Sequence, residues 1–158
     1  MEVSIKLKGT YWDKKPEYKI FIDDQLLKHD FIQAESGVVE AHTFNFDLPE
    51  SDSPQHKITV ELLNKTDDQT VKDQYEDPVN FTIVKDMLLE VTALEIDGLH
   101  LGDLLFSESV YKVNHPVSHS GLNEVTDIRH CTCMGWNGKY VFTFESPFYA
   151  WLIDRMIQ

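Results

Sequence analysis

The sequence predicts an all-β protein, an antiparallel β-sandwich of jelly-roll type with a C-terminal extension that contains a β-hairpin and a short helix. Three observations lead to this fold class. Apolar and polar side chains alternate every second residue in several short stretches, turn-forming residues separate these stretches, and a longer apolar run ends at the turn dipeptide Asp97-Gly98. An alternation of period two is that of a strand with one buried face, and short spacings between strands favour an antiparallel sandwich over alternating strands and helices.

The first elements are two strands joined by a hairpin loop. Residues 4–8 alternate and end at Gly9, and residues 18–23 alternate again through Tyr18 and Ile20. The segment between them contains Pro16, which is typical of a loop. A short third element follows within residues 25–37.

Two further strands are expected over residues 38–48 and 55–64. Phe44 and Phe46 alternate with polar neighbours in the first segment, and Ile58 and Val60 do so in the second. Because only a polar turn at residues 49–54 separates the two segments, we expect these strands to pair with each other antiparallel.

The apolar run over residues 86–98 is expected to be a central strand. A helix is the alternative, because Met87, Leu88 and Glu90 all tolerate helical geometry. Val91 and Ile96 are β-branched, and the Asp-Gly terminator suits the end of a strand better. The sequence therefore favours a strand here.

The last third of the chain has a looser pattern, and a division at Gly98 is expected: a sandwich over residues 1–98 and an extension over residues 99–158. Residues 139–145 alternate as a strand. Pro147 suits the first turn of a helix, and the helical spacing that follows places four large apolar groups on one face. These four are Phe148, Trp151, Leu152 and Met156. They either cover the sandwich core or form an interface with another subunit.

Composition and charge exclude several classes of function. The 158 residues include 27 acidic and 14 basic side chains, a formal net charge of -13. Such a charge disfavours binding to nucleic acid and to anionic membrane surfaces. The N-terminal residues show no signal peptide, and no apolar run reaches the length of a membrane span. We therefore expect synthesis in the cytoplasm and neither nucleic-acid nor membrane partners.

No catalytic constellation is recognisable, and we do not expect an enzyme. His130, Cys131 and Cys133 could bind a metal, but a structural zinc site needs a second ligand pair, which the sequence lacks. The many carboxylates have no glycosidase context. The two cysteines are expected to be free thiols.

Two kinds of binding site remain as hypotheses. The charged stretch after residue 66 is either a solvated loop or, with Asp67, Asp68 and Asp86 as ligands, a cation site, because calcium takes several oxygen ligands. Tyr11, Trp12 and Trp136 lie in turn contexts, where exposed aromatic rings can stack on sugars. The alternative is that these rings fill the ends of the sandwich or form an assembly contact.

Residues 1–98 resemble the calcium-dependent xylan-binding carbohydrate-binding modules, which are small jelly-roll β-sandwiches. In that family one strand ends in Asn-Asp, and a later Asp opens a strand that ends in Asn-Gly or Asp-Gly. The matching residues here are Asn64, Asp86, Leu89, Val91, Ile96, Asp97 and Gly98. Lys65 stands where the family has the second residue of its Asn-Asp pair, a calcium ligand. The resemblance implies a glycan-binding fold and makes Ca2+ a possible cofactor.

The chain as a whole resembles small virion proteins of tailed phages, particularly marine cyanophages. This resemblance rests on the order of a sandwich, the Asn64-Lys-Thr turn, the Asp97-Gly98 ending and a tail that contains Gly135-Trp-Asn-Gly138. It implies a non-enzymatic structural or adhesive component of a virion, whose partners are other virion proteins or further copies of the chain. The alternatives are a calcium-dependent glycan-binding module and a cytosolic protein-binding regulatory protein.

Overall fold

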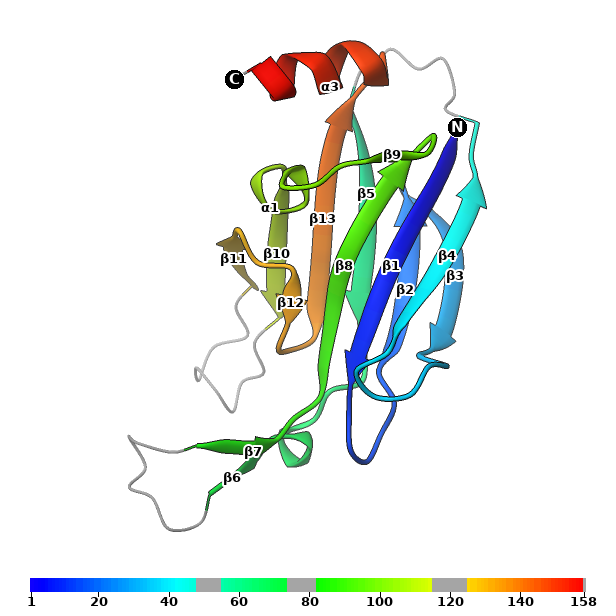
Figure 1. Cartoon of the computed structure of the whole chain (residues 1–158). Helices are drawn as coiled ribbons and strands as arrows, with labels where there is room; N and C mark the ends of the chain where they lie inside the picture. The colour runs from blue at the N-terminus through cyan, green and yellow to red at the C-terminus, as the bar shows by residue number, and fades with distance from the viewer. Residues whose placement is uncertain (48–54, 74–81, 115–124, 158) are drawn as a thin grey trace.

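The chain folds into two antiparallel sheets that pack face to face (Figure 1). This computed structural model describes residues 1–47, 55–73, 82–114 and 125–157. The polar turn expected at residues 49–54 lies outside the described residues. Neither of the helices α1 and α3, described below, is long and apolar enough to cross a membrane.

Sheet A has the strand order β12-β8-β1-β4, with the short strand β9 beside β8. Its members are β1 (Glu2–Thr10), β4 (Val39–Asn45), β8 (Leu88–Ile96), β9 (Leu99–His100) and β12 (Cys133–Met134). β8 confirms the strand expected in the central apolar run, and Asp97 and Gly98 both have the positive φ of the tight turn that ends it.

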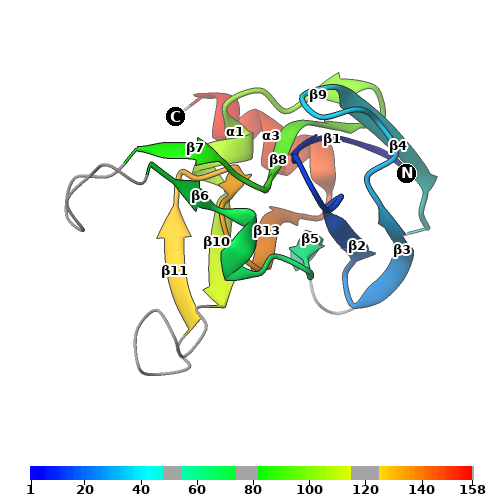
Figure 2. The same cartoon turned by 90° about the horizontal axis from the view of Figure 1, so that it is seen from below.

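Sheet B has the order β11-β10-β13-β5-β2-β3. Its members are β2 (Glu17–Ile22), β3 (Gln25–Phe31), β5 (Gln55–Leu62), β10 (Ser109–Asn114), β11 (Val125–Arg129) and β13 (Gly138–Glu145). Seen from below, β3 and β11 lie at its opposite edges (Figure 2). A separate pair, β6 (Val71–Lys72) and β7 (Ile83–Lys85), projects from the end of the sandwich.

The core lies between the two sheets because β1, β2, β10 and β13 each bury every second side chain. Ile5 and Leu7 of β1 face inward from sheet A, and Ile20 of β2 and Phe142 of β13 face inward from sheet B, all fully buried. The residues between them lie on the outer faces of the sheets, and on sheet B this face carries both charged side chains and partly buried apolar ones. This alternation positions the groove described below.

Two helices complete the fold, the single-turn α1 (Leu104–Ser107) and the C-terminal α3 (Phe148–Ile157). α3 lies across the end of the sandwich opposite β6 and β7 (Figure 1). Its Trp151 ring meets Phe142 edge-on, with ring centroids 6.1 Å apart, and Phe148 and Leu152 are also buried. Met156, in contrast, is 75% exposed. Three of the four side chains on the predicted helical face thus cover the core, and Met156 does not.

The expected boundary at Gly98 is not a boundary of the sandwich. β13 lies between β10 and β5 in the middle of sheet B, so strands from residues 99–158 are integral to it and do not form an extension or a separate hairpin. The expected pairing of residues 38–48 with residues 55–64 is also wrong. β4 pairs with β1 in sheet A, whereas β5 pairs with β2 and β13 in sheet B. The chain crosses between the sheets at this connection, which the short spacing alone does not reveal.

Candidate ligand-binding groove

The predicted cation site does not form from Asp67, Asp68 and Asp86. Asp67 and Asp68 lie on the 3-10 helix η1 (Asp67–Gln69), whereas Asp86 lies just before β8. The carboxylate of Asp68 accepts a hydrogen bond from the Thr66 hydroxyl, which lowers the pKa of Asp68. Among the described residues, no group of three or more His, Cys, Asp or Glu side chains could hold a metal ion.

Asp86 is instead engaged by the ammonium group of Lys65, whose side chain is only 2% exposed. Lys65 Nζ donates to Asp86 Oδ1 and to the Gly135 carbonyl oxygen, at 2.6 Å each. The same carboxylate oxygen accepts hydrogen bonds from the Thr70 hydroxyl at 2.7 Å and the Met87 backbone N–H at 2.8 Å. Calcium would need these oxygens as ligands, and here a buried cation already holds them. The residues at this position therefore do not fit calcium.

The three predicted sugar-stacking aromatics do not converge on one site. Tyr11 packs partly against the core and donates its hydroxyl to the Ala34 carbonyl at 2.9 Å. Trp136 also packs partly against the core. Trp12 is 43% exposed, but its indole N–H is bonded to the Gln69 carbonyl and the Lys85 ammonium lies 5.0 Å from its ring centroid. A sugar-stacking role stays a prediction, best placed at Trp12.

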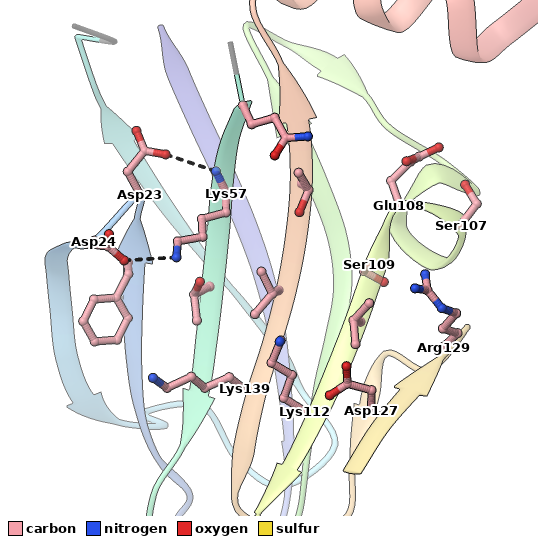
Figure 3. Close-up of a pocket in the computed structure, with 16 residues that line it drawn as sticks. Asp23, Asp24, Lys57, Ser107, Glu108, Ser109, Lys112, Asp127, Arg129 and Lys139 are labelled. Carbon is pink, nitrogen blue, oxygen red and sulfur yellow. Dashed lines mark hydrogen bonds and ion pairs between the residues drawn. The ribbon is translucent and has the colours of Figure 1, made fainter. Parts of the chain in front are cut away.

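A groove of about 760 Å³ crosses the outer face of sheet B (Figure 3). This volume is in the range of small-molecule sites. The floor of the groove contains short side chains, Thr59 of β5, Val141 of β13 and Val110 of β10, which lie opposite one another in register. Phe21 of β2 continues this row at one end, opposite Thr59, and Arg129 of β11 ends it beyond Val110. Short side chains between an aromatic ring and a guanidinium leave room for an extended ligand.

Charged side chains form the rim of this groove. Four are cations, Lys57, Lys112, Arg129 and Lys139, and four are acids, Asp23, Asp24, Glu108 and Asp127. Figure 3 shows them surrounding the short side chains of the floor. A second hollow of about 400 Å³ lies beyond Lys112 and Lys139, which line both.

Three of the four acids on the rim already have cationic or imidazole partners. Asp24 lies 3.1 Å from the Lys57 ammonium. Asp23 lies 3.1 Å from His56 Nδ1 and also accepts the backbone N–H of Lys57. Glu108 lies 2.9 Å from Arg155 Nε on α3. These contacts fix the positions of three of the four carboxylates on the rim.

Sequence reasoning missed this groove. Lys112 and Lys139 read, strand by strand, as the ordinary polar residues of a half-buried sheet. Only the antiparallel pairing of β10 with β13 places these two residues opposite each other, and residues so far apart in the chain carry no local signal of that pairing.

The comparisons with known proteins agree with the geometry of the fold. No protein-family model matches the chain, and no curated protein matches it significantly. A solved structure described as vCBM60 in complex with galactobiose superposes with a TM-score of 0.54 at 9% identity, covering 90% of this chain and 97% of that one. The selenomethionine form of vCBM60, described in connection with two families of calcium-dependent carbohydrate binding modules, gives 0.55 at 10% identity, covering 89% and 88%. At this identity the likeness shows the fold alone.

The predicted fold class, an antiparallel β-sandwich like that of carbohydrate-binding modules, is thus confirmed. The likeness also extends over most of the chain, beyond the residues 1–98 that carried the resemblance in the sequence.

Proposed function

We propose that this chain is a non-catalytic carbohydrate-binding domain that holds a saccharide in the groove across the outer face of sheet B. The observation that carries the proposal is the groove itself, in which hydrogen-bonding side chains converge around a floor of short residues and an aromatic ring. Sugars offer many hydroxyl groups to charged donors and acceptors, and an apolar face to aromatic rings. The sandwich fold, shared with two solved forms of a carbohydrate-binding module, supports the same proposal.

A glycan array followed by isothermal titration calorimetry tests the proposal. Val141→Phe fills the floor of the groove from a side chain that does not face the core. The matched control is Val84→Phe on β7, where Val84 is 59% exposed and distant from the groove. We expect Val141→Phe to abolish binding to a saccharide identified on the array, and Val84→Phe to bind it like the wild type. Equal binding by the two variants would mean that the saccharide binds outside this groove.

Calcium-dependent binding is the second candidate, because the description of one structural neighbour speaks of calcium-dependent modules. Its expected site contains Asp86, but the carboxylate of Asp86 is already bound by the Lys65 ammonium group. Chelation separates the two candidates. Binding through the groove persists in EDTA, whereas a calcium-dependent site loses its ligand in EDTA and after Asp86→Ala.

A place in a phage virion, as a structural or adhesive component, stays a prediction that rests on sequence pattern. A sugar-binding groove is compatible with an adhesive role. Mass spectrometry of purified particles tests the location. A cytosolic protein-binding role predicts a blank glycan array and no virion signal.

A further inference from the structure

Lys112 and Lys139 form a like-charge pair across two neighbouring strands. They lie directly opposite each other in the antiparallel register of β10 and β13, and both side chains are exposed on the outer face of sheet B. Side chains opposite each other on one face lie within about 5 Å at Cβ, so like charges there are destabilising. A bound anion would remove this repulsion.

The acidic neighbours of this pair do not neutralise it by contact. In the same row, Glu61 of β5 lies opposite Lys139, and Asp127 of β11 lies opposite Lys112. Within the described part of the chain, no ion pair joins either ammonium group to a carboxylate, whereas Lys57, on the same face, does contact Asp24. The two ammonium groups therefore remain open to a ligand.

Arg129 adds a third cation at the other side of the floor, opposite Val110 in the neighbouring row. It too has no ion pair among the described residues, so Lys112, Lys139 and Arg129 are three cations on neighbouring strands that no carboxylate of the described residues contacts. Such a group is notable in a chain whose net charge is -13. Thr59 and Arg129 lie three strands apart, about 14 Å at the usual spacing, which accommodates a short oligosaccharide.

We propose that the groove selects saccharides that carry an anionic group, with Lys112, Lys139 and Arg129 as its donors. This inference rests on the proposed glycan-binding function and names the ligand class of the same groove. A carboxylate of a uronic acid and a sulfate ester present the same acceptor chemistry to ammonium and guanidinium groups.

The test measures affinity for three probes by calorimetry: oligogalacturonate, its fully methyl-esterified form, and a sulfated galactan oligosaccharide. The ester keeps the sugar chain and removes the charge. We expect the wild type to bind an anionic probe at least about tenfold more tightly than the ester, because hydrogen bonds to charged groups are the stronger ones. The preference for the anionic probe over the ester should decline as the salt concentration is raised from about 50 to 500 mM, because salt screens the charges. Binding of only one anionic probe identifies the group as carboxylate or sulfate.

The double variant K112Q/K139Q should lose that preference, and the control K14Q/K15Q, which removes the same charge from the exposed loop after β1, should keep it. The melting temperature of K112Q/K139Q should equal or exceed that of the wild type, because the repulsion is gone. Equal affinity for the acid and its ester, in wild type and variant alike, overturns the ligand class and leaves the proposed function intact. Binding to no saccharide on the array overturns both.

Discussion

Replacing Lys65 by Met removes the cation that holds Asp86, Gly135 and the start of β8 together. The carboxylate of Asp86, with its side chain 17% exposed, would keep the Thr70 hydroxyl and the Met87 N–H as donors and lose its only counter-charge among the described residues. Breaking a buried ion pair by removing one partner costs about 3–5 kcal/mol. Because two donors remain, we expect the lower end, about 3 kcal/mol. For a chain of this size that lowers the melting temperature by roughly 6–12 °C.

Thermal unfolding followed by circular dichroism measures this effect, with Lys57→Met as the control. Lys57 pairs with Asp24 at the surface, where Asp24 is 92% exposed, so its loss should leave the melting temperature nearly unchanged. Adding Asp86→Asn to the Lys65→Met variant removes the orphaned charge and should recover part of the stability.

Calcium provides the second half of the test. With the ammonium in place, neither EDTA nor excess calcium should shift the wild-type melting temperature, since a ligand stabilises only a protein that binds it. The reasoning would be refuted if Lys65→Met had the same melting temperature as the wild type, or if calcium raised the melting temperature of the wild type by several degrees.

Three further predictions concern pH, strand packing and α3. Burial lowers the pKa of His42, against a smaller opposing effect of Glu40, so the unfolded chain takes up the proton first as the pH falls below about 6.5. The difference in stability between the wild type and His42→Gln, measured in thermal melts, should therefore decrease from pH 7 to pH 5. A difference that stays constant over this range would contradict the prediction. A Cβ on Gly138 would lie 2.2 Å from the Lys112 carbonyl oxygen, so Gly138→Ala should cost about 3 kcal/mol or more in urea unfolding, unlike Gly135→Ala, which meets only a side chain at 3.9 Å. Trp151→Ala should cost about 3–5 kcal/mol and Met156→Ala little, and similar costs would mean that the burial of α3 is wrongly assigned. Sedimentation equilibrium of Met156→Lys tests whether the exposed side of α3 mediates self-association.

Local structure was predictable wherever a residue pattern determines it. β-branched residues and the Asp97-Gly98 turn define β8, the alternation over residues 139–145 defines β13, and Pro147 marks the start of α3. Each of these signals lies within one segment. Strand pairing joins segments that lie far apart in the chain. The sequence therefore predicts the wrong partner for β4 and places β13 in an extension.

The candidate site was the least predictable feature, for the same reason. Trp12 and Asp86 are conspicuous in the sequence as an aromatic and an acidic residue in loops, yet Trp12 is hydrogen-bonded to Gln69 and Asp86 to Lys65. The hydrogen bonds that engage these groups come from residues far apart in the sequence. Lys112 and Lys139 are ordinary in sequence and become notable only once their strands are neighbours.

The position of β13 between β5 and β10 has a consequence for how the protein is made. Of the strands of sheet B, β2, β3 and β5 leave the ribosome first, but β5 lacks one of its two neighbours until residues 138–145 have been synthesised. At ordinary translation rates this interval lasts several seconds, during which an apolar strand face and an open edge are exposed. The nascent chain is thus a candidate client for chaperones until the last strands complete sheet B and cover the open edge of β5.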